Sequence, residues 1–191
     1  MTGGQPVPSS ASPERIVWRR LDDGDYRKFA AESNDASTGG GARDLRFRNW
    51  DAFEPIMERM FPGRKPNSGP RKVEVLTGSL CWDAGGITRR SEASVWPPTK
   101  ARPNEGRLAT VYLYPPFRDA KRFPGQVELV VLVQDSDHEV WPYVIGHREL
   151  DSWDDSISRP ILDCLFRADR SDSTFAAGFI DLVNGLRECV V

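Results

Sequence analysis

An apolar hairpin in the second half of the chain constrains the fold most. Val127–Val133 reads VELVVLV, a nearly continuous apolar run that is typical of a strand lying centrally in a sheet. The acidic segment Gln134–Glu139 (QDSDHE) follows, and the apolar segment Val140–Ile145 comes directly after it. Two apolar strands joined by a short polar turn predict an antiparallel hairpin.

The other strand-like segments are also joined by short turns or loops rather than by crossover helices. Further strands are predicted over Ile16–Leu21, Arg43–Arg48, Val73–Trp82, Glu92–Trp96 and Leu108–Tyr114. Helical periodicity is found over Leu21–Glu32, Phe53–Met60, Ile161–Phe166 and Phe175–Val183. This order predicts an α+β fold, mainly β, in which a barrel or curled sheet is flanked by short helices and followed by a helical C-terminus.

The length of 191 residues suits one domain. Met1–Pro13 is rich in Gly, Pro and Ser and predicts a disordered tail, so we expect a single domain over residues 14–191. No apolar run is long enough to cross a bilayer, and the N-terminus lacks a signal peptide. Three widely spaced cysteines, Cys81, Cys164 and Cys189, form no disulfide framework or zinc pattern, which predicts a reduced, cytoplasmic protein.

The formal net charge of -2 hides an asymmetry along the chain. Residues 1–107 carry 18 Lys and Arg against 14 Asp and Glu, whereas residues 108–191 carry 8 against 14. The first part is therefore at +4 and the second at -6, which suggests that one face meets an anion. Most of the basic residues are Arg, which donates bidentate hydrogen bonds to phosphate and to the guanine edge.

Signals for catalysis are scarce. The chain has two histidines, His138 and His147, neither with a plausible partner, and it lacks HExxH, GxSxG and Walker-type motifs. Glu128, Asp135 and Asp137 are the candidate ligands of a magnesium-dependent nuclease, but the same strands supply no Lys. The favoured interpretation of these acids is a solvated hairpin tip. We therefore predict no catalytic residue, no metal and no cofactor.

Two loops are better candidates for binding. Ser33–Arg48 (arm 1, SNDASTGGGARDLRFR) combines short polar side chains, a glycine run that lets a ligand approach the backbone, and three arginines. Pro97–Arg107 (arm 2, PPTKARPNEGR) is stiffened by prolines, which lowers the entropy cost of binding. The candidate DNA-contacting residues are Ser33, Asn34, Asp35, Thr38, Gly40, Gly41, Arg43, Arg46 and Arg48 in arm 1, and Lys100, Arg102, Asn104, Glu105 and Arg107 in arm 2.

Together these features resemble the N-terminal effector-binding domain of the EcoRII restriction endonuclease, over residues Ile16–Ile157. The motifs that carry the resemblance are Arg20-Leu21, Asn34-Asp35 before Thr38-Gly39-Gly40, Phe53 to Met60-Phe61-Pro62, Lys100-x-Arg102, and Asn104-Glu105-x-Arg107. The resemblance implies a DNA-binding pseudobarrel, akin to the B3 domain of plant transcription factors, whose two arms enter the major groove. Its recognition residues would fall on Lys100, Arg102, Glu105 and Arg107, and near Gly41 and Arg46.

The sequence departs from that family at three positions. Gly41 stands where the family has a histidine, Gly106 stands where it has a basic residue, and Pro103 adds a residue to arm 2. These differences leave the DNA target open. The family's enzyme also carries a nuclease domain after this one, for which the chain has no room. We therefore expect either a piece of a larger enzyme or a stand-alone reader that partners with a nuclease.

Three functions follow as hypotheses. The leading one is a sequence-specific double-stranded DNA-binding module without catalytic activity. The second is the small magnesium-dependent nuclease. The third is a protein-interaction module whose acidic docking patch is Asp151–Ser156 (DSWDDS), with Asp151, Trp153, Asp154 and Asp155 as contacts.

Overall fold

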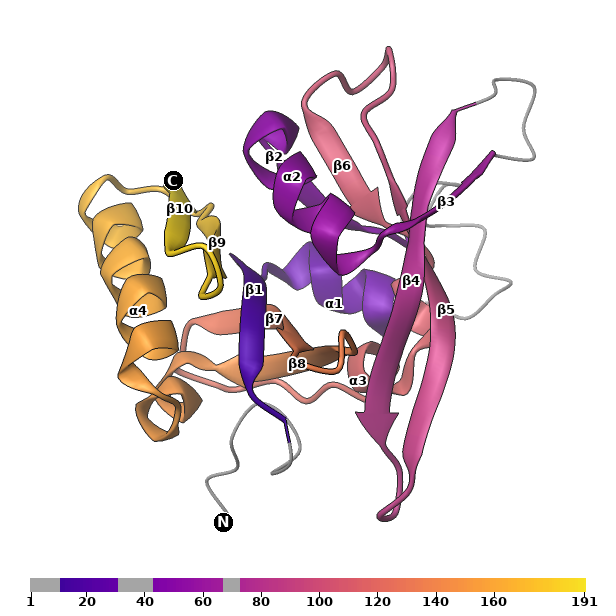
Figure 1. Ribbon diagram of the computed structural model, residues 1–191. Coiled ribbons are helices and arrows are strands. Elements are labelled where there is room, and N and C mark those ends of the chain that lie inside the picture. The colour runs from indigo at the N-terminus through magenta and orange to yellow at the C-terminus, as the bar shows by residue number, and fades with distance from the viewer. Residues whose placement is uncertain (1–10, 31–42, 67–72) are drawn as a thin grey trace. The chain divides into compact units, whose positions relative to one another are not determined.

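The computed structural model describes residues 11–30, 43–66 and 73–191, and Figure 1 shows its helices and strands. The chain divides into two compact units: unit 1 comprises Met1–Asp22 and Lys121–Val191, and unit 2 comprises Asp23–Ala120. Strands outnumber helices in both units, so the chain is of the predicted mixed, mainly β class. Within the described ranges, no helix has the length and apolarity that crossing a membrane requires.

Unit 1 is built on an antiparallel arrangement of strands. Their order is β10 (Leu186–Val190), β9 (Ala177–Asp181), β1 (Pro13–Arg20), β7 (Glu128–Asp135) and β8 (Val140–Gly146). Every residue of β7 is buried, as its apolar run predicted, and β8 pairs with it in the predicted hairpin. The strand β1 begins at Pro13, three residues before the strand expected from the sequence.

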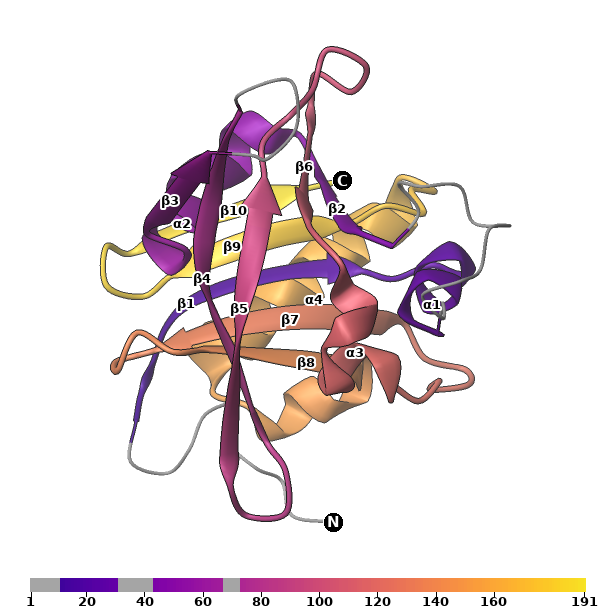
Figure 2. The ribbon, with the colours of Figure 1, turned by 90° about the vertical axis from the view of Figure 1, so that its right-hand side faces the viewer.

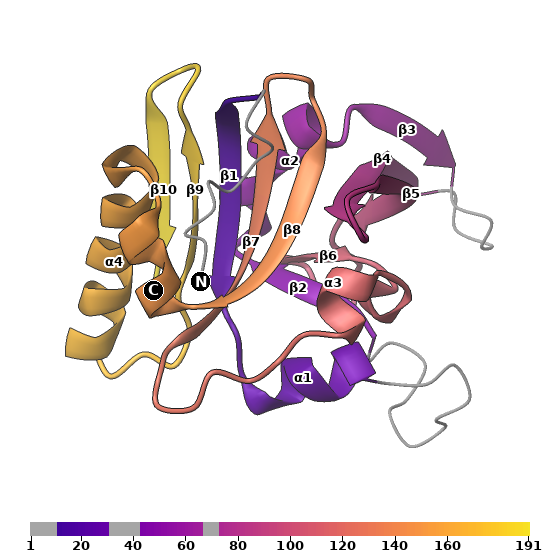
Figure 3. The ribbon, with the colours of Figure 1, turned by 90° about the horizontal axis from the view of Figure 1, so that it is seen from below.

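One long helix, α4 (Asp155–Arg170), packs against β9 and β10 (Figure 3). It follows the short 3-10 helix η3 (His147–Ser152), and Asp154 caps its N-terminus by accepting a hydrogen bond from the backbone N–H of Ser156 at 2.8 Å. The helix buries Ile157, Ile161 and Cys164.

The C-terminal segment was predicted to be helical, but it forms two strands. Phe175–Val183 contains β9, and the chain returns as β10 after a turn in which Asp181 accepts hydrogen bonds from the backbone and side-chain amides of Asn184. A side chain at Gly178 would lie 2.3 Å from the carbonyl oxygen of Glu188 on β10, so glycine permits this close pairing.

The expectation of three reduced cysteines is wrong for two of them. Cys164 on α4 and Cys189 on β10 form a disulfide with a Cα–Cα distance of 5.8 Å. Spacing along the chain could not reveal this pair, because the C-terminal strand that carries Cys189 was not expected. Cys81 is free and buried, as its apolar strand indicated.

Unit 2 consists of antiparallel strands with short helices. The strand order is β3 (Gly63–Pro66), β4 (Glu74–Asp83), β5 (Thr88–Trp96), β6 (Glu105–Leu108) and β2 (Leu45–Arg48). The helices are α1 (Asp23–Ala30), α2 (Trp50–Met60), the 3-10 turn η2 (Val111–Leu113) and α3 (Pro115–Arg118). Ring contacts join them in the core, with centroids 5.5 Å apart for Phe47–Phe53 and 5.4 Å apart for Phe29–Phe117.

One strand predicted in unit 2 is wrong, and one observed strand was not predicted. Leu108–Tyr114 is not a strand: β6 ends at Leu108, and Thr110 has a left-handed backbone (φ 53°) that turns the chain into η2. Gly63–Pro66, which was not among the predicted strands, pairs with β4 as β3. The pairing is tight, because a Cβ at Gly63 would meet Thr77 Oγ1 at 2.4 Å.

Candidate nucleic-acid interface

The described parts of the two arms lie next to each other in the sheet of unit 2. Strand β2, which ends arm 1, pairs with β6, which ends arm 2, so that Arg46 lies opposite Arg107 and Arg48 lies opposite Glu105. Directly opposed residues on antiparallel strands present their side chains on the same face. The alternation of β2 buries Leu45 and Phe47 and leaves Arg46 and Arg48 at the surface, as predicted.

Arm 2 is a narrow extension of strands β5 and β6. Thr99 and Arg102 form an isolated antiparallel bridge, with N–H···O distances of 2.9 and 3.2 Å, around the exposed turn residues Lys100 and Ala101. The base of the arm is tied to α2, because the carbonyl oxygen of Asn104 accepts a hydrogen bond from the backbone N–H of Trp50 at 3.2 Å. Backbone pairing thus orders the loop that carries the candidate side chains.

Arg107 is anchored from two sides. Its Nη1 donates to Asp44 Oδ2 at 2.9 Å, and its guanidinium carbon lies 5.0 Å from the ring centroid of Trp96. Asp44 also accepts from the backbone N–H of Thr110 at 3.1 Å, so the carboxylate that orients Arg107 is itself held in place. Within the described residues, the buried Nε of Arg107 has no hydrogen-bond partner.

Glu105 forms ion pairs with two further arginines of this surface. Its Oε2 accepts from Arg46 Nη1 at 3.3 Å and from Arg102 Nη1 at 3.1 Å. The side chain of Arg102 is 52% exposed, whereas those of Arg46 and Glu105 are 20% and 26% exposed. Each arm therefore contributes one arginine to a shared carboxylate. We call Asp44, Arg46, Arg102, Glu105 and Arg107 the arm cluster.

Gly106, one of the positions that depart from the EcoRII pattern, has a packing reason. A Cβ there would lie 1.8 Å from the ring of Trp50, which is itself 2% exposed. The indole of the first residue of α2 therefore covers the backbone of β6, and a basic side chain cannot be placed at this position without moving it.

The arm cluster lines only a small hollow. The hollow is bordered by Arg46, Arg102, Glu105 and Arg107 together with Pro97 and Thr99, and its volume is about 20 Å³. This volume holds about one water molecule and not a small-molecule substrate. The arrangement suits the surface recognition of a larger ligand.

Six of the predicted site residues of arm 1 lie outside the described residues: Ser33, Asn34, Asp35, Thr38, Gly40 and Gly41. Arg43 is placed 4.9 Å from the ring centroid of Tyr112, and its carbonyl oxygen accepts from the N–H of Val111 at 3.1 Å.

Sequence reasoning missed two residues of the surface, Asp44 and Trp96. Asp44 lies within arm 1, and Trp96 comes directly before arm 2. Their closeness in sequence to the two arms is the signal that could have identified them. What the sequence lacked was the β2–β6 register, which brings Asp44 to Arg107.

The charge asymmetry of the sequence follows the two units. Unit 2 contains 16 Lys and Arg against 13 Asp and Glu, a net charge of +3, and unit 1 contains 10 against 15, a net charge of -5. Unit 2 carries both arms, so the basic excess accompanies the arm cluster.

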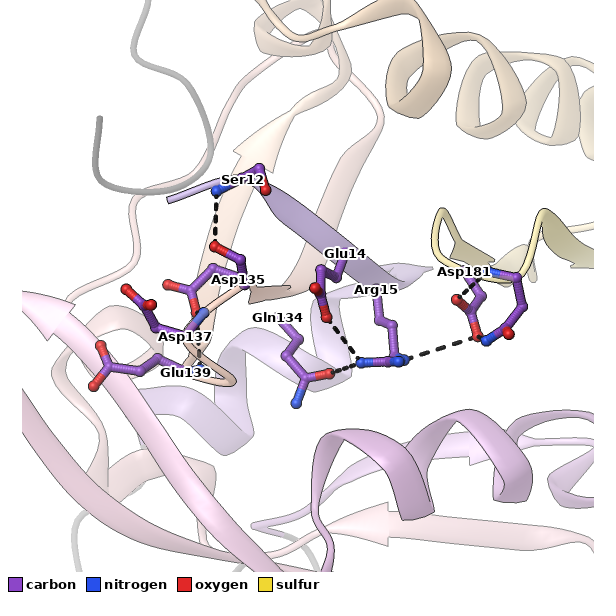
Figure 4. Close-up of polar contacts among 10 residues, drawn as sticks. Ser12, Glu14, Arg15, Gln134, Asp135, Asp137, Glu139 and Asp181 are labelled. Carbon is purple, nitrogen blue, oxygen red and sulfur yellow. Dashed lines mark hydrogen bonds and ion pairs between the residues drawn. The ribbon is translucent and has the colours of Figure 1, made fainter. Parts of the chain in front are cut away.

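Two of the three candidate nuclease carboxylates, those of Asp135 and Glu128, have structural roles in unit 1, and Asp137 is exposed. Asp135 Oδ1 accepts from the backbone N–H groups of Asp137 and Glu139 at 3.0 and 2.9 Å, and its Oδ2 accepts from Trp141 Nε1 at 2.7 Å. Figure 4 shows Asp135, Asp137 and Glu139 gathered at this turn. Glu128 accepts from Arg122 and from the backbone N–H of Phe123. Across the described part of the chain, no three His, Cys, Asp or Glu side chains are grouped as a metal ion would need.

Two residues of the acidic docking patch, Trp153 and Asp154, have structural roles, and Asp151 and Asp155 are exposed. Trp153 is 9% exposed and packs edge-on against Tyr143, with ring centroids 5.8 Å apart. Asp154 is the cap of α4, and its hydrogen bonds from Ser156 lower the pKa of its carboxyl group. Asp155 forms an ion pair with Arg159 at 2.8 Å.

The histidine His147 accepts a hydrogen bond through its Nδ1 from the backbone N–H of Val127 at 3.1 Å.

Comparison with known proteins gives no relative for this chain. No protein-family model matches it, and searches of curated proteins and of solved structures return no significant match.

Proposed function

We propose that the chain is a sequence-specific double-stranded DNA-binding module without catalytic activity, built as a pseudobarrel like the EcoRII effector-binding domain. Arm 1 (Ser33–Arg48) and arm 2 (Pro97–Arg107) read the major groove. The observation that carries this proposal is the pairing of β2 with β6, which places Arg46 of one arm opposite Arg107 of the other.

The electrostatics of the arm cluster support this function. Arg46, Arg102 and Arg107 outnumber the two acids that hold them, so the cluster keeps a positive charge. Ion pairs at partly exposed sites contribute little to stability, so exchanging Glu105 for a guanine edge or a phosphate has a low cost. Such a pre-oriented arginine loses less side-chain entropy on binding than a free one.

The proposal includes the biological setting implied by the resemblance. The module recognises the target of a bacterial restriction-modification defence system, and it works in the cytoplasm with a nuclease domain or subunit as its partner. The disulfide Cys164–Cys189 is unusual for that compartment, so the state of these thiols in cells bears on the localisation.

The experiment that tests the proposal is selection of bound duplexes from a random pool, with and without base methylation, followed by fluorescence anisotropy on the enriched sequence. Replacing Arg102 with Ala is expected to remove about 1–3 kcal/mol of target discrimination, roughly 5- to 150-fold in affinity. Arg118→Ala is the matched control, because Arg118 is 54% exposed and forms an equivalent ion pair with Asp119 on α3.

Three results decide the outcome. An enriched motif, a steep loss of affinity with salt and a selective defect of Arg102→Ala support the proposal. Absence of DNA binding at low salt overturns it. If the pool yields a motif but Arg102→Ala and Arg107→Ala bind it like the parent while remaining folded, the assignment of arm 2 is wrong.

A further inference from the structure

Strand β5 has arm 2 after its last residue and an exposed hairpin turn before its first. This turn joins β5 to β4. Figure 2 shows this turn at the lower end of the two strands and arm 2 beyond their upper end. The hairpin is paired over eight consecutive residue pairs, from Leu76↔Val95 to Asp83↔Thr88. Both ends belong to unit 2, so β5 connects them as one continuous strand.

The turn is held by one backbone hydrogen bond and one side-chain hydrogen bond. Gly85 and Gly86 have φ angles of 66° and 79°, and the backbone N–H of Ala84 donates to the carbonyl of Ile87 at 2.9 Å. Two positive φ angles in a two-residue hairpin loop describe a type I′ turn, whose twist matches the flanking strands. Asp83 Oδ1 accepts from the N–H of Gly86 at 2.8 Å, so the acid nearest the tip is engaged in the turn.

Exposed basic and apolar side chains lie together at the tip. Ile87 is 56% exposed although it is a large apolar residue, and Arg89 and Arg90 follow it at exposed positions. Arg89 lies opposite the half-buried Trp82 in the strand register and forms no ion pair within the described residues. Arginine next to an exposed aliphatic side chain on a protruding turn fits the phosphate backbone and the edge of the minor groove.

The spacing between the two ends of β5 matches DNA. Thr99, where the bridge of arm 2 forms, is ten positions after Arg89 and three beyond the end of β5, and a fully extended chain covers roughly 33 Å over ten positions. One turn of B-form DNA is about 34–36 Å long. A straight duplex lying along β5 therefore presents equivalent backbone positions to both ends.

We propose that the hairpin tip Asp83–Arg90 is a second, sequence-independent DNA contact, in which Arg89 binds a phosphate one helical turn away from the arms and Ile87 packs against the minor-groove edge. This inference rests on the proposed function of the arms. It adds a contact that lengthens the footprint without adding specificity.

The experiment compares two fluorescein-labelled duplexes that carry the sequence enriched by selection. The short duplex ends close to that sequence, and the long duplex extends about one helical turn, ~10 base pairs, beyond it on both sides. We expect the parent to bind the long duplex about tenfold more tightly. Arg89→Ala should abolish most of this gain and lower the salt slope on the long duplex by about 0.9, the value for one phosphate contact.

The variants separate the tip from the arms. Arg89→Glu should weaken binding to the long duplex more than Arg89→Ala does, Ile87→Ser should weaken it a fewfold, and Arg118→Ala should leave it unchanged. None of these should alter binding to the short duplex, and all are at exposed positions, so their thermal unfolding should match the parent.

Two failures are distinguishable. If the parent binds both duplexes equally, or Arg89→Ala and Arg89→Glu behave like the parent on the long duplex, the tip is not a contact and the proposed function of the arms stands. If neither duplex is bound, the proposed function fails and this inference fails with it.

Discussion

The same kinds of side chain form two networks with different consequences in unit 1 and unit 2. In unit 1, Arg15 lies near the fully buried Asp181, its Nε 3.8 Å from Asp181 Oδ2, and donates to Gln134 at 2.9 Å (Figure 4). In unit 2, the arm cluster joins arginines and carboxylates whose side chains are 11% to 52% exposed.

The difference lies in what happens when a partner is removed. A buried charge that loses its partner keeps its desolvation cost, whereas a partly exposed charge regains water or another ligand. The unit 1 network is therefore expected to maintain the fold, and the arm cluster to exchange partners. Reduction of the disulfide and substitutions at Asp135, Gly106 and Glu105 should then lower the free energy of unfolding by progressively smaller amounts.

The disulfide of unit 1 should have the largest effect. Cys164 and Cys189 are 25 residues apart, so loop-closure entropy predicts that reduction lowers the free energy of unfolding by about 3.5 kcal/mol. Urea unfolding with and without dithiothreitol measures this change. Cys189→Ser should be less stable than the oxidised parent and insensitive to the reductant. If dithiothreitol does not change the free energy of unfolding of the parent, the disulfide does not form in solution.

Removing the buried carboxylate of Asp135 should have the second-largest effect on the free energy of unfolding. Asp135→Ala leaves Trp141 Nε1 and two turn amides without their acceptor, which should lower the free energy of unfolding by about 3 kcal/mol. Asp137→Ala, at an exposed neighbouring position, is the control and should change stability little. Loss of a magnesium-dependent nuclease activity in Asp135→Ala, without loss of stability, would favour the nuclease hypothesis instead.

Gly106 tests the packing beneath the arm cluster. Gly106→Ala forces the ring of Trp50 to move, and overpacking of this kind should cost about 2 kcal/mol of unfolding free energy. Because β6 also carries Glu105 and Arg107, DNA affinity should fall as well. Thermal unfolding and anisotropy on the same sample measure both effects. A stable variant with parental affinity would show that Trp50 does not hold the arms.

Glu105 should show the smallest effect on stability. Glu105→Gln removes a partly exposed charge that two arginines share, so the free energy of unfolding should change by less than about 0.5 kcal/mol. Without the carboxylate, nonspecific DNA affinity at low salt should rise roughly threefold, because repulsion of phosphate is lost. A large loss of stability here would remove the contrast between the two networks.

The sequence predicted elements with strong, regular patterns and missed those without them. The apolar run of Val127–Val133 became the fully buried β7, and the alternation of Arg43–Arg48 became β2. The strand β10 (Leu186–Val190, LRECV) is mostly exposed and carries no alternation signal. The short apolar run of Phe175–Val183 is compatible with a helix or a strand. It contains β9 because this segment pairs with β1 in the folded protein.

The candidate site was predictable in its residues and not in its contacts. Arginines in two Gly- and Pro-bearing loops are visible in the sequence, and Arg46, Arg102 and Arg107 do lie on one surface of unit 2. The roles of Asp44 and Glu105 depend on the register between β2 and β6, whose residues are about sixty positions apart in the chain. Such long-range pairing leaves no local pattern to read.

The division of unit 1 into two chain segments has a consequence for protein synthesis. Arg20 of β1 pairs with Leu129 of β7, so β1 emerges from the ribosome more than a hundred residues before its neighbour. The chain is synthesised at roughly 5–20 residues per second, so about 5–20 s pass before β7 can pair with β1. During this time the side chains of Ile16, Val17 and Trp18, which are buried in the folded protein, cannot pack against β7. Unit 2 is complete in that interval and can fold first. We therefore expect the nascent strand β1 to be a site at which a chaperone binds until β7 is synthesised.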